Sequence, residues 1–311
     1  MRTAFLDELH ALAKADNNIM LLTADLGYGV FEDFESKFPQ QYLNVGVAEQ
    51  NMIGIATGLA LDGFRIFVYS IGNFPTMRCL EQIRNDACYH NLNINIVASG
   101  GGFSYGALGM SHHATEDLAV MRALPNTTVT APSSPWETKM ATRALISKVG
   151  VGYLRLDKSS YSYEPHINER FSLDKASLIQ DGSDITIICT GGILTEAIKS
   201  AELLEQNHIT VRIISMHTIK PVDEIAIDNA IRETGGILIL EEHSKIGGLG
   251  SAVSECCMRN GWQPGFFKHF ALEDTFSSVV GTQNFLRGYY KMDANSIYEY
   301  IMTIKNNKSV L

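Results

Sequence analysis

The chain has 311 residues, of which 45% are hydrophobic and 19% charged, and its formal net charge is −9. This composition is typical of a globular protein, and at roughly 100–200 residues per domain the length predicts two domains. The negative charge argues against a nucleic-acid partner, which requires a basic surface. The five cysteines include no CxxC pair, which favours a reduced, cytoplasmic setting. No apolar stretch approaches the roughly 20 residues of a membrane span, so we expect no membrane partner.

The first half of the chain alternates short apolar runs with helical patterns. Residues 2–16 have apolar side chains at helical spacing, and AEQNMIGIATGLALDG, RCLEQIRNDACYH and PWETKMATRALIS also carry helical patterns. The predicted strands are NIMLLTADL, QYLNVG, RIFVYS, NINIVAS, NTTVTAPS and GVGYLRLD. Strands that alternate with helices predict a parallel, doubly wound α/β sheet. Because the strands are almost continuously apolar, we expect helices on both faces of this sheet.

The second half repeats this rhythm after a polar segment. DITIICTG, ITVRIISMHTIKP and GILILEE predict strands, and ILTEAIKSAELLEQN and DEIAIDNAIRETG predict helices. A further helix is predicted after KIGGLGS, with the adjacent Cys256 and Cys257 as small apolar residues, and another at the C-terminus. We therefore expect one α/β domain over residues 1–160, a linker with one short strand over residues 161–183, and a second α/β domain over residues 184–311.

Glu49 stands where the predicted strand QYLNVG passes into a helix, among small and apolar residues. Parallel α/β sheets bind their ligands at this edge, so the carboxyl could act on a bound ligand. An acidic residue at a helix N-terminus also favours the helix dipole and needs no ligand. Spacing alone gives these two interpretations equal weight.

The stretch SGGGFSYGALGMSHHATED, residues 99–117, is long and glycine-rich, and it contains His112 and His113 just before a predicted helix. Long loops at the edge of a sheet are usually functional. A histidine there could hydrogen-bond a polar substrate or carry a proton. A metal site with Glu116 or Asp117 is less favoured, because adjacent side chains point apart.

Two other side chains follow predicted strands. Phe74 lies in a turn before Pro75, where its ring could stack on a flat ligand or simply fill the core. Arg155 ends the strand YLRL and could bind a phosphate or carboxylate, or form a surface ion pair with Asp157. The glycines of KIGGLGS lack the GxGxxG spacing of a phosphate-binding loop, so they predict close packing of a helix on a strand.

These motifs occur in an order that resembles the thiamine-diphosphate enzymes of the transketolase family, from near residue 1 to near residue 300. The stretches TADL, NVGVAEQNMIGIATGLAL, SHHATEDLAVMRALPNTTVTAPS and YLRL resemble the pyrimidine-binding domain. The stretches GSDITIICTGGILTEAIKSAELL, SMHTIKPVDE and LILEEHSKIGGLGSAVSE resemble the transketolase C-terminal domain. The GDG motif of the family's diphosphate-binding domain does not occur in the sequence. The chain therefore resembles the separate C-terminal subunit of a split transketolase.

This resemblance implies thiamine diphosphate as the cofactor, with Mg²⁺ (or Ca²⁺) held by the partner subunit and no metal held by this chain. The implied partner is the N-terminal transketolase subunit in an α2β2 heterotetramer, with a homodimer of this chain as an alternative assembly. The implied reaction moves a two-carbon ketol unit between sugar phosphates. The alternatives are half of a 1-deoxyxylulose-5-phosphate-synthase-like enzyme, the beta subunit of a 2-oxo acid dehydrogenase, and a non-catalytic scaffold.

The resemblance also assigns roles to single residues. Glu49 matches the catalytic glutamate that hydrogen-bonds N1′ of the aminopyrimidine ring, and Phe74 matches the aromatic residue that stacks on this ring. His112 matches a catalytic histidine that contacts a substrate hydroxyl, with His113 beside it as a further substrate contact. Arg155 matches a phosphate-binding arginine.

Four further positions bear on the cofactor pocket or on the choice of sugar. Asp25, in TADL, is expected on the cofactor side. Ile71 and Met77 stand where the family often has aromatic residues, so we expect a more aliphatic cofactor pocket. Leu108 replaces an aspartate that usually lies four residues before His112, which leaves the choice of sugar open.

Overall fold

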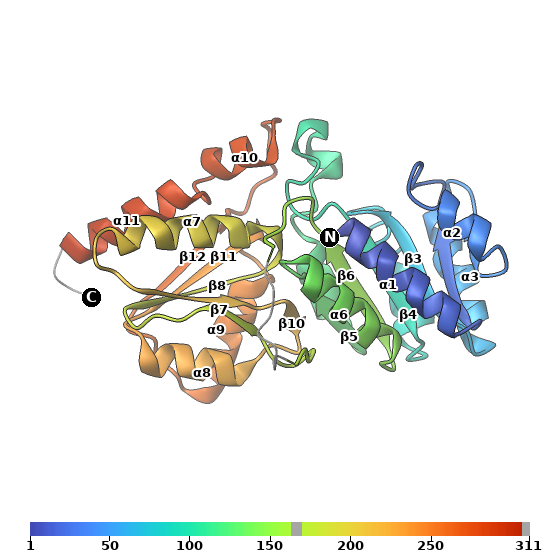
Figure 1. The fold of residues 1–311 in the computed structure, drawn as a ribbon, viewed down its shortest axis with the longest axis horizontal. Coiled ribbons are helices and arrows are strands. Elements are labelled where there is room, and N and C mark those ends of the chain that lie inside the picture. Colours follow the sequence, from blue (N-terminus) through green and yellow to red (C-terminus); the bar gives the residue numbers. More distant parts are fainter. Residues whose placement is uncertain (163–169, 307–311) are drawn as a thin grey trace.

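The computed structural model describes residues 1–162 and 170–306, which form two α/β units side by side (Figure 1). The sheet of the first unit has the strand order β10-β5-β6-β4-β3-β1-β2. Strands β1 to β6 pair in parallel, whereas β10 is antiparallel to β5. The strands are β1 (Ile19–Thr23), β2 (Tyr42–Asn44), β3 (Arg65–Ile71), β4 (Ile94–Ser99), β5 (Thr127–Thr130), β6 (Val151–Leu156) and β10 (Thr218–Lys220).

Helices cover both faces of this sheet, as the apolar strands predict. In β1, Ile19 and Leu21 belong to one apolar core and Met20 and Leu22 to another, because alternate side chains point to opposite faces. The first core lies under α1 (Arg2–Ala15), α2 (Glu32–Lys37) and α6 (Pro135–Ile146). The second lies under α3 (Glu49–Leu61), α4 (Leu80–Gln82), a π-helical turn (Ile83–Cys88) and α5 (Asp117–Ala123).

The second unit has a five-stranded sheet in the order β12-β11-β8-β9-β7. Its strands are β7 (Ser177–Gln180), β8 (Ile185–Cys189), β9 (Val211–Ser215), β11 (Ile237–Ser244) and β12 (Phe267–Leu272), and only the β7–β9 pairing among these is antiparallel. One face carries α7 (Leu194–Glu205), α10 (Gln283–Tyr289) and α11 (Ala294–Asn306), and the other carries α8 (Glu224–Glu233) and α9 (Leu249–Asn260) (Figure 1). Strand β7 falls within the predicted linker, of which residues 163–169 lie outside the described residues.

The two units are joined by backbone pairing and by a common core. Strand β10 follows β9 along the chain but pairs with β5 of the first sheet. The core under α3 and α5 continues into the second unit, where it includes Ile188, Ile214 and Leu249. The two-domain α/β fold predicted from the sequence is confirmed. Its two domains contribute side chains to one apolar core.

His217 lies at this junction, between β9 and β10, and only 1% of it is exposed. Its ring stacks on Phe171 with 4.5 Å between ring centroids. Nδ1 lies 2.9 Å from the hydroxyl of Thr218. Burial lowers the pKa of His217 from 6.5 to about 4, because the charged imidazolium cannot be solvated there.

We expect His217 to make the fold sensitive to acid. Between pH 6.5 and 4 the unfolded chain binds this proton more tightly than the folded chain, so the free energy of unfolding falls as the pH drops through that window. At about 1.4 kcal/mol per pH unit, the loss is about 3 kcal/mol. Urea unfolding of the wild-type chain and of His217→Gln can be measured at several pH values. The free energy of unfolding should depend less steeply on pH in the variant than in the wild-type chain. Equal slopes would contradict the prediction.

All five cysteines are buried and unpaired. Cys256 and Cys257 lie in α9, as predicted. Burial raises the pKa of the Cys79 thiol to about 12 and that of Cys88 to about 11, so neither is a ready nucleophile. Among residues 1–162 and 170–306, no helix combines the length and apolarity needed to cross a membrane.

Candidate functional site

The residues predicted for a site in the first domain follow the carboxyl ends of its strands. Asp25 comes after β1, Glu49 begins α3 after β2, and Ile71 ends β3. His112 lies in the long loop after β4, and Arg155 lies near the end of β6. In a sheet with parallel strands these ends meet at one edge, which is where α/β folds bind ligands.

Glu49 lies in the first turn of α3, and only 6% of it is exposed. Its Oε1 accepts a hydrogen bond from Nη1 of Arg78 at 3.0 Å. The same guanidinium lies over the ring of Phe74, with 3.9 Å between Cζ and the ring centroid. Because a cation is attracted to an aromatic face, Arg78 connects the carboxyl of Glu49 to the ring of Phe74.

Arg78 was not among the residues predicted from the sequence. Its position four residues after Phe74 is the signal that could have identified it, because residues at this spacing share one face of a helical turn. The backbone here is a series of turns before α4, and one of them has a helix-like hydrogen bond, because the N–H of Met77 donates to the carbonyl of Asn73 at 3.0 Å.

A cleft of about 480 Å³ lies between this segment and the His112 loop. The rings of Phe74 and His112 meet edge to face with 5.4 Å between their centroids. Met77 and His113 also line the cleft, so the structure brings four of the predicted residues together. Phe276, from the segment after β12, contributes an apolar side chain from the second domain. Phe276 was not predicted from the sequence, because β12 was not recognised there.

The two histidines of this loop have different surroundings. His112 is partly exposed, and its Nδ1 lies 3.0 Å from the hydroxyl of Ser111. His113 is buried, and its Nε2 lies 3.1 Å from the carbonyl oxygen of Gly106. Because a carbonyl only accepts hydrogen bonds, Nε2 is the donor in this contact, and in the neutral imidazole Nδ1 is then an acceptor.

Two buried acceptors at this cleft have no hydrogen-bond partner among residues 1–162 and 170–306. They are Nδ1 of His113 and Oδ1 of Asn73. The amide of the same Asn73 donates to the backbone carbonyl oxygen of His113 at 2.6 Å, which fixes the Asn73 side chain against the backbone of His113. Buried polar groups are normally hydrogen-bonded, so this pair fits a ligand that donates hydrogen bonds.

Within the two described ranges, no group of three or more histidine, cysteine, aspartate or glutamate side chains is placed to hold a metal ion. His113 bonds to Gly106 instead, and Asp117 accepts a hydrogen bond from the hydroxyl of Tyr153 at 2.5 Å.

Asp25 and Ile71 lie outside this cleft. Asp25 has a left-handed backbone, with φ of 55°. Its N–H donates to Oδ1 of Asn44 at 2.9 Å, and its carboxylate accepts from the hydroxyl of Tyr28 at 3.2 Å. These three residues line a separate cavity of about 210 Å³. Ile71 is half-buried at the end of β3 and does not line the cleft of Phe74.

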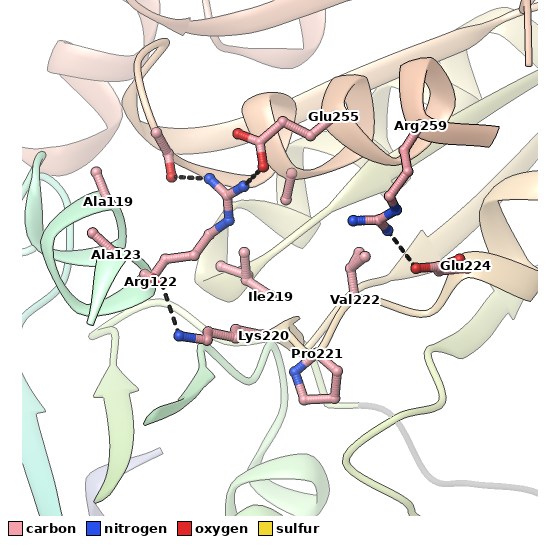
Figure 2. Close-up of a pocket in the computed structure, with 12 residues that line it drawn as sticks. Ala119, Arg122, Ala123, Ile219, Lys220, Pro221, Val222, Glu224, Glu255 and Arg259 are labelled. Carbon is pink, nitrogen blue, oxygen red and sulfur yellow. Dashed lines mark hydrogen bonds and ion pairs between the residues drawn. The ribbon is translucent and has the colours of Figure 1, made fainter. Parts of the chain in front are cut away.

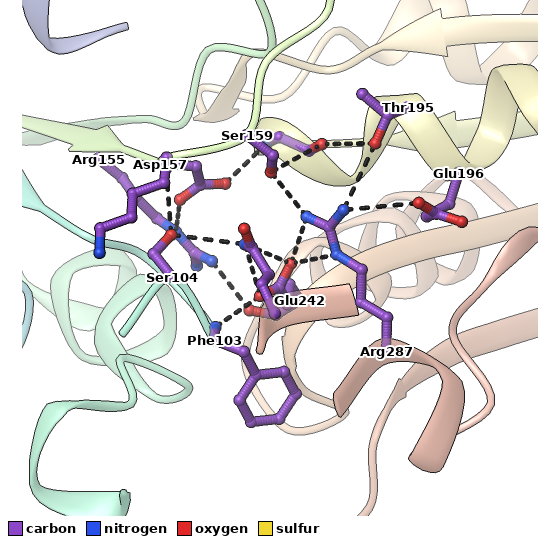
Figure 3. A network of polar contacts seen from close by, with 12 residues as sticks. Phe103, Ser104, Arg155, Asp157, Ser159, Thr195, Glu196, Glu242 and Arg287 are labelled. Atoms are coloured by element: carbon purple, nitrogen blue, oxygen red, sulfur yellow. Dashed lines mark hydrogen bonds and ion pairs between the residues drawn. The ribbon is translucent and has the colours of Figure 1, made fainter. Parts of the chain in front are cut away.

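Arg155 lies near the end of β6, as the sequence predicted, but its side chain is buried and not open to a ligand. Only 2% of Arg155 is exposed. Its guanidinium lies 3.3 Å from a carboxylate oxygen of Asp117. It also lies 3.1 Å from a carboxylate oxygen of Asp157 and donates to the carbonyl oxygen of Glu242 at 2.9 Å (Figure 3). Burial alone would lower the pKa of Arg155, but the two carboxylates raise it above its ordinary value. The ion pair with Asp157 is therefore buried at the domain junction, and the guanidinium is not available to a substrate phosphate.

Lys158, three residues further on, is an exposed cation near the cleft. Its Nζ lies 4.0 Å from the ring centroid of Tyr105, and that ring lies 6.4 Å from the ring of His112. Only the arginine of YLRLDK was predicted as a site residue, because the sequence does not show which of the two cations is buried.

A second cleft, of about 610 Å³, lies between α5 and the second domain and contains none of the predicted residues (Figure 2). The charged side chains that line this cleft bind to other groups of the same cleft. Arg122 pairs with Glu255, Arg259 pairs with Glu224, and Lys220 donates to the carbonyl oxygen of Arg122 at 3.0 Å. We therefore interpret this cleft as part of the domain junction.

Comparison with known proteins identifies the same two domains. A family model described as the transketolase pyrimidine-binding domain matches residues 1–164, and one described as the transketolase C-terminal domain matches residues 174–297. A putative transketolase C-terminal section from Methanocaldococcus jannaschii is 38% identical over 305 residues, which cover 97% of this chain and 95% of that protein. An apulose-4-phosphate transketolase subunit from Phocaeicola vulgatus is 36% identical over 264 residues, which cover 83% and 84% of the two chains.

Structural comparison gives the same result. A solved structure described as a split-gene transketolase, an inactive beta4 tetramer, matches with a TM-score of 0.86 and 32% identity, covering 97% of this chain and 96% of the other.

The 1-deoxy-D-xylulose-5-phosphate synthase of Desulforudis audaxviator is 29% identical over 96% of this chain, but only 47% of the synthase is covered. On these matches, the chain belongs to the transketolase family of thiamine-diphosphate-dependent enzymes and consists of its pyrimidine-binding and C-terminal domains.

Proposed function

We propose that this chain is the C-terminal subunit of a two-chain transketolase that moves a two-carbon ketol unit between sugar phosphates. The observation that carries the proposal is the cleft in which Phe74 and His112 meet beside the Arg78–Glu49 pair. Relatives named as a transketolase C-terminal section and as a transketolase subunit, which match over most of their length, support a division of the enzyme into two chains. The partner chain would bring the diphosphate-binding domain and Mg²⁺, in an α2β2 assembly.

The residues at the cleft fit the aminopyrimidine end of thiamine diphosphate. Phe74 offers a flat ring, and Asn73 beside it offers an unpartnered acceptor for a hydrogen bond. When bound, thiamine diphosphate supplies a carbon nucleophile at C2 of its thiazolium ring. The task of Glu49 is to hold a proton at the ring nitrogen N1′, and Arg78 fixes the position of this carboxyl.

We assign the sugar to the side of the cleft where His112 lies. The imidazole is partly exposed and is oriented by the hydroxyl of Ser111, so it can hydrogen-bond a substrate hydroxyl. We assign to Lys158 the phosphate-binding role that the sequence suggested for Arg155, because the residue is exposed and its Nζ lies over Tyr105 of this loop. Leu108, 55% exposed, presents an apolar side chain where the family usually has an aspartate.

The test is reconstitution of the two chains. The purified chain alone should show no turnover, and addition of the N-terminal transketolase subunit of the same organism with thiamine diphosphate and Mg²⁺ should give ketol transfer from a ketose phosphate. Full turnover by the single chain would sink the proposal. If the pair released CO₂ from a 2-oxo acid instead, the synthase or dehydrogenase alternative would replace it; the match to synthases over 96% of this chain is the observation in favour of that alternative.

A further inference from the structure

We propose that the second domain holds the His112 loop in its working position, and that Glu242 is a positioning residue for the sugar side of the site. The kinetic part of this inference rests on the proposed function, whereas its structural part does not. The relevant residues lie where the loop after β4 meets β11 and α10 (Figure 3).

Phe103 anchors the loop of the first domain in the second domain. Its side chain is fully buried and belongs to the apolar core under α7 and α11. Its ring stacks on Tyr290 at 5.6 Å between centroids and meets the ring of His113 edge to face at 5.1 Å. His113, the neighbour of His112 in the sequence, therefore packs its ring against Phe103, a side chain that the second domain holds in place.

Glu242, in β11, fixes the backbone at the same point. One carboxylate oxygen accepts a hydrogen bond from the N–H of Phe103 at 2.5 Å. The carboxylate also accepts from Gln283 at 2.9 and 3.1 Å and from Nε of Arg287 at 2.8 Å. The amide of Gln283 lies 3.5 Å from the hydroxyl of Ser104, which follows Phe103 in the loop. A buried carboxylate with this many donors has little freedom to move.

Two glycines show how closely the loop approaches the second domain. A Cβ atom at Gly102 would lie 2.7 Å from Cγ of Glu242, and one at Gly106 would lie 2.6 Å from the carbonyl oxygen of Gly281. The carbonyl oxygen of Gly106 accepts from the N–H of Gly281 at 3.3 Å and from Nε2 of His113 at 3.1 Å. A continuous set of contacts thus runs from the second domain through Gly106 to the histidine beside His112.

These contacts reach the sugar side of the site and not the cofactor side. Glu49 is held instead by Arg78, and Arg78 lies on Phe74, within the first domain. Loss of Glu242 should therefore weaken the use of the sugar while leaving proton exchange at C2 of thiamine diphosphate intact. A general loss of structure would reduce both.

The kinetic test compares Glu242→Ala and Glu242→Gln in the two-chain enzyme with thiamine diphosphate and Mg²⁺. For Glu242→Ala we expect KM for the donor sugar to rise roughly ten- to hundredfold, because small displacements of a contact are costly. C2 proton exchange should stay at the wild-type rate. Glu242→Gln keeps an acceptor for the Phe103 N–H and should recover part of the loss. Unchanged KM, or a parallel loss of C2 exchange, would overturn the proposal.

Glu8→Ala is the matched control. Glu8 is also a buried carboxylate with an arginine partner, since Arg143 donates to it at 2.7 and 3.0 Å between α1 and α6. It does not contact the His112 loop, so KM should stay unchanged in this variant. If Glu242→Ala does not fold, Gln283→Ala takes its place, because Gln283 is only partly buried and contacts the same carboxylate.

Amide hydrogen exchange gives a readout that needs no activity. In the full-length chain, Glu242→Ala should accelerate exchange in the peptide 99–117 by about tenfold or more, with the peptides of α1 and α6 unchanged. Unaltered exchange in this peptide would overturn the inference, even if ketol transfer had been demonstrated. If the two-chain enzyme showed no ketol transfer, the proposed function would fail while this measurement still decided the role of Glu242.

Discussion

Replacing Glu49 by glutamine should slow exchange of the C2 proton of thiamine diphosphate in the two-chain enzyme by about 100- to 10,000-fold, the usual size of a general acid–base contribution. The amide preserves the shape of the side chain but cannot give a proton to N1′. The position is sensitive because the carboxyl is 6% exposed and is fixed by Arg78 at 3.0 Å. The exchange rate is measured by NMR after mixing into D₂O and quenching with acid.

His112→Ala is the control for this experiment, because His112 lines the cleft of Phe74 and is assigned to the sugar, not to the cofactor. We expect it to keep C2 exchange near the wild-type rate and to lose efficiency with the sugar. Wild-type exchange in Glu49→Gln would show that the carboxyl has another role. Unchanged kinetics of His112→Ala with every donor tested would remove this residue from the site.

Arg155→Ala should lower the free energy of unfolding by about 3–5 kcal/mol, the typical cost of removing one partner from a buried ion pair. Two carboxylates would lose their cation. Among the contacts within residues 1–162 and 170–306, Asp117 would keep the hydrogen bond from the hydroxyl of Tyr153, and Asp157 would keep the one from the N–H of Gly192 at 2.7 Å. Removing one partner costs more than the pair contributes, because the remaining charges stay out of water.

Denaturant unfolding measures this loss, and Arg232→Ala provides the comparison. Arg232 forms an ion pair with Asp228 one helical turn earlier at 2.7 Å, but its side chain is 67% exposed. Such pairs contribute only about 0.3–0.5 kcal/mol. If Arg155→Ala were as mild as Arg232→Ala, Arg155 would not be the structural residue described above.

The sequence was most informative where local pattern and burial agree. Strands β1, β3, β4 and β8 are continuous apolar runs because helices cover both faces of their sheets, and such runs are visible without a structure. The positions of Phe74 and His112 followed from the order of the strands, since loops at the carboxyl ends converge. The helical pattern of RCLEQIRNDACYH was also recognised, although its second part is a π-helical turn, which the spacing of apolar residues does not distinguish.

What the sequence did not reveal depends on distant parts of the chain. Arg155 is buried because Asp117, 38 residues away, and Glu242, 87 residues away, meet at the domain junction. Nothing near YLRLDK distinguishes this arginine from the exposed Lys158. Strand β10 has three residues and forms by pairing with a strand of the other domain, so its own sequence carries almost no strand signal.

The pairing of β10 with β5 has a consequence for any attempt to divide this chain. A fragment ending near residue 162 would leave the backbone groups of β5 unpaired at the edge of the first sheet. It would also uncover apolar side chains such as Met121, which now share a core with residues of the second unit. Free strand edges and exposed apolar surface promote aggregation. The pyrimidine-binding domain is therefore a poor candidate for expression alone. Fragments and fusion proteins of this chain should keep both domains in one polypeptide.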